Sequence, residues 1–302
     1  MKSKWKKYIP IYIMALPGLL YLCINNYMPM FGLVMAFKNL DFRLGIWKSP
    51  WAGLKNFEFL FKSKDAFAIT RNTLLYNLAF IIISLVISIM VAILLSEVKN
   101  KMASRVYQSA ILIPYLMSWV VVGYLVYAVL SSDTGFANKS VFEPMGLSGI
   151  SWYTENKYWP FILTIVNQWK NIGFTTVIYL ASIVGISRDY YEAARIDGAT
   201  KWNQIRYITL PLLKPTVITL TLLNVGRIFY SDFGLFYQVP RNSGMLYDTT
   251  RTIDVYVYNA LMKNTDYALA SAASFYQSVV GFILILAANM IIRKFSRENA
   301  LF

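Results

Sequence analysis

The feature that most limits how this 302-residue chain folds is a set of long segments without a charged side chain. Residues 8–37, 72–96, 106–132 and 267–292 contain no Lys, Arg, Asp or Glu. Each is at least as long as the roughly 20 residues that a helix needs to cross the hydrocarbon layer of a membrane. The hydrophobic share of 57% is also too high for an ordinary soluble domain. The sequence therefore predicts an integral membrane protein.

Two further apolar stretches carry isolated charges, Lys170 in the first and Arg227 and Asp232 in the second. Charges at membrane depth are costly, so they are expected to face the interior of a helix bundle or a wet cavity. With these stretches, the sequence predicts an all-α fold, one membrane domain over 1–302, with six transmembrane helices. The expected spans are about 8–37, 74–96, 106–131, 160–186, 215–236 and 273–293.

The first span follows Lys2, Lys4, Lys6 and Lys7, as the apolar part of a signal peptide also would. The apolar region is too long for a signal peptide, and no small-x-small cleavage site ends it. Proline removes an amide donor and clashes with the preceding helical turn. We therefore expect a retained first helix that is broken or kinked near Pro29.

The distribution of Lys and Arg predicts the orientation, because the cytoplasmic segments of membrane proteins are enriched in both. With the N-terminus inside, four inner segments hold 15 Lys and Arg in 54 residues, whereas three outer segments hold 12 in 103. This difference favours a cytoplasmic position for both termini. The inner segments are 1–7, 97–105, 187–214 and 293–302, and the outer segments are 38–73, 131–159 and 237–274.

The composition excludes several classes of function. The chain has no His and one cysteine, Cys23, so a Ser/His/Asp nucleophile or a zinc site is excluded, and we expect no catalytic or metal-binding residue. It lacks the phosphate-binding loop G-x-x-x-x-G-K-[ST], so any ATP that drives it binds to another subunit. The net charge of +14 does not indicate nucleic-acid binding, because long uncharged stretches separate the cations.

The longest inner segment, 187–214, has the pattern of a helix, a turn and a second helix. Ser187 and Thr200 are residue types that cap helix N-termini. Gly198 is expected to end the first helix, because glycine enters the left-handed conformation at the lowest cost.

Prolines are expected to end the second helix of this segment. Pro211 and Pro215 precede the fifth span and are predicted to stop the helix there. A short hairpin of this kind fits into the groove of a partner protein. As an amphipathic element it is equally suited to rest on lipid headgroups.

The same segment carries several residues at fixed spacing. The pattern is Glu192-Ala193-Ala194, three residues, Gly198, nine residues, and Ile208-Thr209-Leu210-Pro211. It resembles the E-A-A-x3-G-x9-I-x-L-P signature of ABC importer permeases. This resemblance implies the type I importer permease fold and a coupling helix that docks into a separate ATPase.

A second resemblance covers the rest of the chain. It rests on residues 16–18, 29–38 and 49–57, which are similar to those of sugar-importer permeases. Within that group the chain resembles the LplB-like and alginate-importer branch, which handles large oligosaccharides and polysaccharide fragments.

The resemblance implies a multi-pass carbohydrate permease in the bacterial cell membrane, surrounded by lipid. Its implied partners are a second homologous permease, two copies of a cytoplasmic ATPase that holds ATP and Mg²⁺, and an extracellular solute-binding lipoprotein that delivers an oligosaccharide. This chain is expected to bind no cofactor. The residues expected at the ATPase contact are Arg188, Glu192, Ala193, Ala194, Asp197, Gly198, Leu210 and Pro211.

Polar side chains within the spans are candidates for the substrate pathway. Helical spacing places Asn167, Lys170 and Asn171 on one face of the fourth span. The same spacing places Asn224, Arg227 and Ser231 on one face of the fifth. An alternative role for each is to hold helices together. The full candidate set is Asn167, Trp169, Lys170, Asn171, Asn224, Arg227, Tyr230, Ser231, Asp232 and Gln277.

The first outer segment, 38–73, has a net charge of +4. Such a charge can attract an acidic binding protein or an acidic glycan, and it can equally contact anionic headgroups.

Two other classes of protein fit the composition less well. A secondary transporter or channel needs coupling carboxylates at mid-membrane, and only Asp232 has a suitable position. A membrane-bound enzyme needs paired acids in a cleft, whereas the acids of this chain are scattered.

Overall fold

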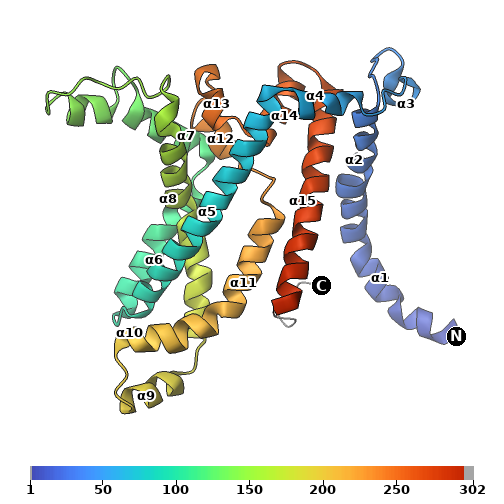
Figure 1. Ribbon diagram of the computed structural model, residues 1–302. Coiled ribbons are helices and arrows are strands. Elements are labelled where there is room, and N and C mark those ends of the chain that lie inside the picture. The colour runs from blue at the N-terminus through green and yellow to red at the C-terminus, as the bar shows by residue number, and fades with distance from the viewer. Residues whose placement is uncertain (1, 296–302) are drawn as a thin grey trace. The chain divides into compact units, whose positions relative to one another are not determined.

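The computed structural model describes residues 2–295 and is built from helices (Figure 1). Within that range, extended pairing is confined to one bridge between Lys38 and Trp51. The predicted inner segment 293–302 lies outside the described residues from position 296 onward.

Fifteen α-helices follow one another in the described part of the chain. They are α1 (Lys2–Leu22), α2 (Met28–Met30), α3 (Gly45–Lys48), α4 (Glu58–Lys62), α5 (Lys64–Ser96), α6 (Lys101–Leu116), α7 (Trp119–Leu130), α8 (Trp159–Val184), α9 (Arg188–Ile196), α10 (Lys201–Gln204), α11 (Leu210–Gly226), α12 (Phe233–Gln238), α13 (Tyr247–Thr250), α14 (Ile253–Met262) and α15 (Tyr267–Phe295). Short 3₁₀ segments lie at Phe31–Phe37, Lys55–Phe57, Asn156–Tyr158 and Gly244–Leu246, and π-helical turns at Cys23–Tyr27, Ala137–Phe142 and Ile205–Thr209.

The chain forms two compact units. The first unit comprises Met1–Ser63 and Val257–Tyr276, and the second comprises Lys64–Tyr256 and Gln277–Phe302.

In the first unit, the predicted break near Pro29 is a change of helix type. One helical path runs over Tyr8–Phe37. It passes through a π-turn at Cys23–Tyr27 immediately before the proline and continues as a 3₁₀-helix after it. In the π-turn the Met28 N–H donates to the Cys23 carbonyl. Proline lacks the N–H donor of an α-helical hydrogen bond. A helix can compensate by changing its hydrogen-bond pattern to a π-turn or a 3₁₀-helix at that point.

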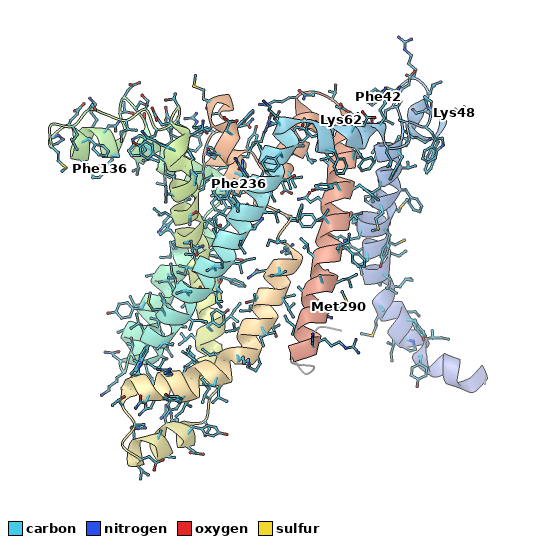
Figure 2. The ribbon with its side chains drawn as sticks, viewed as in Figure 1. Phe42, Lys48, Lys62, Phe136, Phe236 and Met290 are labelled. Carbon is cyan, nitrogen blue, oxygen red and sulfur yellow. The ribbon has the colours of Figure 1, made fainter. Side chains whose placement is uncertain are left out.

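The segment after this helix is held by a buried cation. Lys38 is 3% exposed, and its Nζ donates to the carbonyls of Ile46 at 2.9 Å and Trp47 at 2.7 Å. Asn56 Nδ2 donates to the carbonyls of Ala36 and Lys38. Segment 38–73 has seven cations that were expected to attract an acidic partner. One of them, Lys38, is instead buried and stabilises the fold. Figure 2 labels Lys48 and Lys62, which lie in this unit with exposed side chains.

The second unit is organised around α5 and α8, which pack along each other. One apolar cluster at this contact includes Tyr76, Trp159, Leu163 and Phe236, the last labelled in Figure 2. A second cluster joins the end of α5 to α8 and α11 through residues such as Leu213.

Helix α6 packs on α8 at very short range. A Cβ atom at Gly173 would overlap the backbone carbonyl of Ile111, so this contact requires glycine.

Four helices in the described part of the chain are long and apolar enough to cross a membrane. They are Tyr8–Phe37, Lys64–Ser96, Lys201–Gly226 and Tyr267–Lys294. The number rises to six if two bent pairs are each one span. In these pairs α6 meets α7 at 95°, and the helix Asn156–Val184 meets α9 at 66°.

The expected third span, 106–131, is wrong as a single helix. Met117 is extended, and the Ser118 side chain caps α7 by accepting a hydrogen bond from the Val121 N–H. The bend of 95° separates the two halves. A serine that can cap a helix N-terminus indicates the start of a new helix. The uninterrupted apolar pattern favoured one long helix and hid this indication.

The expected fifth span, 215–236, is wrong at both ends. The helix starts at Lys201, passes through Pro211 and Pro215, and ends at Gly226. The two prolines therefore do not stop the second helix of the inner hairpin. A π-turn at Ile205–Thr209 precedes Pro211, and there the Leu210 N–H donates to the Ile205 carbonyl, five residues back. Proline is tolerated early in an α-helix, where its missing donor is least needed.

The remaining expected spans are helical with shifted ends. Helix α5 begins at Lys64, ten residues before the expected start at 74, and α15 begins at Tyr267 instead of 273. Helix α8 matches the expected range 160–186 to within two residues.

Candidate functional site

The predicted hairpin of segment 187–214 lies at one end of the second unit, where α9 and α10 project from the other helices (Figure 1). Ser187 Oγ accepts from the Asp189 N–H and Thr200 Oγ1 from the Asn203 N–H, so both predicted caps are confirmed. Gly198 has φ +78°, which confirms the predicted left-handed turn.

Backbone hydrogen bonds close the end of α9. The Gly198 N–H donates to Arg195 and the Ala199 N–H to Ala194, which is the paired pattern of a Schellman motif. A Cβ atom at Gly198 would meet no atom within 4 Å. Glycine is therefore required by the backbone conformation and not by crowding.

Helix α9 is presented to the outside of the chain. None of its residues is buried, and Ile196 is 87% exposed. It is attached by the Tyr191 hydroxyl, which lies 2.9 Å from Thr209 Oγ1. The start of α10 is attached by Lys201 Nζ, which lies 2.6 Å from a carboxylate oxygen of Glu97 after α5.

All eight residues expected at the ATPase contact lie in segment 187–214, at this end of the second unit. Seven of them are exposed and Ala194 is half-buried. The exposed seven are Arg188, Glu192, Ala193, Asp197, Gly198, Leu210 and Pro211. An exposed helix with small residues and a rigid, capped elbow is well suited to enter a groove on another protein.

A second polar feature is the interruption between α11 and α12, over residues 227–232. Its backbone carbonyls are satisfied by side chains from two other helices. Asn77 Nδ2 of α5 donates to the carbonyls of Ile228 at 2.8 Å and Tyr230 at 3.1 Å. Gln277 Nε2 of α15 donates to the Phe229 carbonyl at 2.5 Å. Irregular backbone at membrane depth requires such partners, because no water satisfies it there.

Asp254 of α14 holds the same interruption from another side. Its Oδ2 accepts from the backbone N–H and the hydroxyl of Ser231, both at 2.7 Å. Its two carboxylate oxygens also accept from Gln277 Nε2 at 3.2 Å.

The interruption corrects the expected face of the fifth span. Asn224 lies in α11, whereas Arg227 and Ser231 lie beyond its end, so the three do not share a helix face. Arg227 and Asp232, the two charges of this stretch, form no ion pair with each other within the described residues. Asp232 instead caps α12, and its Oδ2 accepts from Trp119 Nε1 at 2.8 Å.

Lys170 lies in the interior, at the bend between α6 and α7. It is 5% exposed, and its Nζ donates to the carbonyls of Pro114, Tyr115 and Met117 at 3.3, 2.8 and 2.7 Å. All three ammonium protons therefore have backbone acceptors. Lys170 pairs with the Tyr115 and Met117 carbonyls at the end of α6 and shares the Pro114 carbonyl with the Met117 N–H. Of the two expected surroundings, the bundle interior is the one that the structure shows.

The structure divides the ten pathway candidates into two groups. Five are exposed: Trp169, Asn224, Arg227, Tyr230 and Asp232. The others are buried or half-buried: Asn167, Lys170, Asn171, Ser231 and Gln277. Within the second group, Asn171 Nδ2 donates to Asn167 Oδ1 at 2.8 Å.

Comparison with known proteins identifies the family. The sequence profile described as "binding-protein-dependent transport system inner membrane component" matches residues 84–297. This chain belongs to that family. It is a permease subunit of an ABC importer in the cell membrane, and not an enzyme.

Individual permeases of Bacillus subtilis (strain 168) are similar over nearly the whole chain. Protein LplB is 32% identical over 300 residues, covering 99% of this chain and 91% of LplB. The polygalacturonan/rhamnogalacturonan transport system permease protein YteP is 33% identical over 289 residues, covering 96% of this chain and 89% of YteP.

Solved structures are similar to the same extent. A chain in the crystal structure of a bacterial ABC transporter that imports the acidic polysaccharide alginate superposes with a TM-score of 0.89 at 31% identity, covering 97% of this chain and 98% of that chain. A chain of the bacterial alginate ABC transporter in complex with a periplasmic protein bound to an alginate pentasaccharide gives a TM-score of 0.88 at 30% identity, covering 97% of each. The permease fold that the motif implied is therefore confirmed.

Sequence reasoning missed several residues that organise this permease. Asn77 lies within a run that was treated as uniformly apolar, and Asp254 lies in a segment assigned to the outside. A lone Asn within an apolar run is a signal that this position needs a polar partner. Nothing in the sequence near Asp254 indicated that it contacts Ser231.

Among the described residues, no group of three His, Cys, Asp or Glu side chains is placed to bind a metal ion.

Proposed function

We propose that this permease forms the translocation pathway together with a second, homologous permease, and that it carries oligosaccharides delivered by an extracellular solute-binding protein. Two copies of a cytoplasmic ATPase, which bind ATP and Mg²⁺, power the cycle. The chain crosses the membrane six times with both ends inside. The observation that carries this proposal is the exposed, capped α9 hairpin in a chain of this family.

The hairpin acts as the coupling element. Glu192 and Gly198 sit in the cleft of the ATPase, and the other expected contact residues surround them. Closure of the ATPase dimer moves the hairpin, and the motion passes to the rest of the chain through the continuous helix Lys201–Gly226. The Lys201–Glu97 ion pair and the Tyr191–Thr209 hydrogen bond support this role, because they tie the hairpin to α5 and to the start of that helix.

The substrate pathway uses the two groups of polar residues differently. The exposed residues Trp169, Asn224, Arg227 and Tyr230 contact the sugar, because aromatic faces stack on pyranose rings and polar groups bond hydroxyls. Among the buried and half-buried residues, Lys170, Ser231 and Gln277 hold bends in the helical paths, and Asn167 and Asn171 bond to each other within α8. Asp232 belongs to the pathway wall through its bond to Trp119.

The proposed class of substrate draws on the similar proteins. The two solved structures belong to an importer of alginate, and YteP is named for polygalacturonan and rhamnogalacturonan. YteP is 33% identical over nearly the full chain, which supports a polymer fragment rather than a monosaccharide as cargo.

Reconstitution tests the proposal. Proteoliposomes that contain this chain, its partner permease and the ATPase should take up an oligosaccharide only with ATP inside and the loaded binding protein outside. Vesicles that contain this chain alone should show no uptake. Uptake by the isolated chain without ATP would contradict the proposal and favour a secondary transporter or channel.

Cysteine labelling tests the orientation. In a Cys23→Ser background, Lys139→Cys in the outer segment should react with a membrane-impermeant maleimide in intact cells. Asp189→Cys in α9 should react only after the membrane is opened. The reverse pattern would contradict cytoplasmic termini.

A further inference from the structure

Helices α7 and α12 lie at the end of the second unit opposite α9 (Figure 1). A pocket opens between these two helices. Its volume is about 210 Å³, and its walls include Tyr124, Tyr127, Tyr237, Gln238 and Arg241. None of these residues is among the ten pathway candidates. With Asn242, which also lines the pocket, three phenol rings, one guanidinium and two amides converge on it.

The pocket is built by close packing of the two helices. A Cβ atom at Gly123 of α7 would lie 2.9 Å from the Gln238 carbonyl oxygen of α12, so the helices approach too closely for a larger side chain. The Trp119–Asp232 hydrogen bond joins the starts of the same two helices at 2.8 Å. A pocket with such walls is preformed, which lowers the entropic cost of binding.

Arg241 is presented by an unusual turn. Arg241 and Asn242 both have positive φ, at 55° and 47°. Residues with side chains adopt this conformation only at an energetic cost, and such strain gathers at binding sites. The turn is fixed by the Asn242 N–H donating to the Tyr237 carbonyl and by the Tyr247 hydroxyl donating to Asn242 Oδ1 at 3.0 Å.

The Arg241 guanidinium lies over an aromatic ring. Its Cζ is 4.2 Å from the centroid of Tyr127. Within residues 2–295 it forms no ion pair with Asp or Glu. Stacking on a ring holds a guanidinium flat and leaves its fork of donors available to a carboxylate.

Neighbouring rings hold the tyrosines in place. Tyr127 meets Tyr153 edge to face at 5.5 Å, and Tyr237 stacks on Phe233 at 4.9 Å. Burial raises the pKa of the Tyr153 phenol, which therefore stays neutral and donates to the Val239 carbonyl at 3.2 Å. Tyr124 is 66% exposed, so its ring is available to a ligand.

We propose that this pocket binds one acidic sugar unit of the oligosaccharide at the outer end of the pathway, with Arg241 pairing with the carboxylate and the tyrosines packing against the ring. This inference rests on the proposed function. The volume is below the roughly 300–1,000 Å³ of pockets that enclose a drug-sized ligand, which suits a single unit of a longer chain. A neutral sugar would use the ring faces and leave the cation without a partner.

Uptake of two matched sugars tests the site. The complete importer, reconstituted with its binding protein, is supplied with tetragalacturonate or with the same tetrasaccharide fully methyl-esterified, which removes the charges and keeps the rings. Arg241→Gln should raise the concentration for half-maximal uptake of the acidic form by about tenfold, since a hydrogen bond to a charged group is lost. It should leave uptake of the ester within about twofold.

Two further variants make the result specific. Arg241→Lys keeps the charge but loses the fork, so it should restore uptake of the acidic form only in part. Lys157→Gln removes an exposed cation elsewhere in the outer segments and should change the uptake of neither sugar. Equal uptake of tetragalacturonate by Arg241→Gln and the unaltered importer would overturn the site. Failure of the unaltered importer to take up either sugar would instead contradict the proposed oligosaccharide function.

Discussion

The α9 hairpin and the interruption between α11 and α12 are both breaks in a helical path, and they are held in opposite ways. The hairpin is shaped by neighbours in sequence, through the caps at Ser187 and Thr200 and the left-handed Gly198. The interruption is shaped by residues far away in sequence, Asn77, Asp254 and Gln277. An element that a partner must recognise can be shaped by residues near it in sequence. A bend that must stay rigid inside a bundle needs contacts from residues far away in sequence.

The contrast predicts that substitutions at the interruption lower stability, whereas substitutions in the hairpin lower coupled uptake. The largest effect on stability is expected at Asp254. Asp254→Leu leaves the Ser231 N–H without its acceptor. It also removes one of two acceptors from the Ser231 hydroxyl, which keeps Thr252 Oγ1, and from Gln277, which keeps the Phe229 carbonyl. The expected loss is about 3 kcal/mol, since buried donors left unpaired each cost on the order of 1–3 kcal/mol. Thermal unfolding of the purified complex in detergent should show a lower midpoint, with Asp254→Asn intermediate. A midpoint equal to that of the exposed variant Asp248→Asn would contradict the proposed network.

The bend between α6 and α7 should respond next. Lys170→Met keeps the length of the side chain and removes the donor shared by three carbonyls. We expect a loss of about 2 kcal/mol, measured by the same unfolding experiment. Lys157→Met, at an exposed cation, should stay within about 0.5 kcal/mol. Equal midpoints for the two variants would show that Lys170 does not stabilise the bend.

The hairpin should behave differently, because its changes act on coupling and not on the core. Gly198→Ala forces a side chain into the left-handed region, at a local cost of about 1–2 kcal/mol. Gly185→Ala is the matched control, since Gly185 has φ −73° at the other end of the same loop. We expect Gly198→Ala to reduce uptake per ATP hydrolysed, while its unfolding midpoint falls by less than that of Asp254→Leu. A fall in the midpoint without a change in coupling would reverse the contrast between the two regions.

The smallest effect is expected where the hairpin touches α5. Lys201→Gln removes the ion pair with Glu97, which is exposed on both sides and contributes at most about 1 kcal/mol. Coupled uptake should fall slightly at low salt and match the unaltered importer at high salt, where exposed charges are screened. A deficit that persists at high salt would mean that Lys201 has another role.

The same contrast explains what the sequence could predict. The caps and glycine of the hairpin are local signals, and all three were predicted correctly. Charge-free length predicted a membrane protein with long helices. The bend after Leu116 and the end of α11 at Gly226 were missed, because apolar periodicity continues across both.

What local patterns could not show is which polar residue pairs with which. In the sequence, Lys170, Ser231 and Gln277 look the same as exposed residues such as Arg227 and Tyr230, because all of them are polar or aromatic side chains within apolar stretches. Only the tertiary contacts separate those that satisfy the backbone from those that are exposed. The motif indicated the family, whereas only the fold shows which polar residues satisfy the backbone and which are exposed.

The most direct test of the account is the charge reversal Glu192→Lys in the reconstituted importer, with uptake and ATP hydrolysis measured side by side. Glu192 is exposed on a helix without buried residues, so membrane insertion and the unfolding midpoint should be unchanged. The account predicts that binding-protein-dependent uptake falls more than tenfold and that ATP hydrolysis no longer responds to the loaded binding protein. Unchanged uptake with unchanged stimulation of hydrolysis would contradict the role of α9 as the contact with the ATPase.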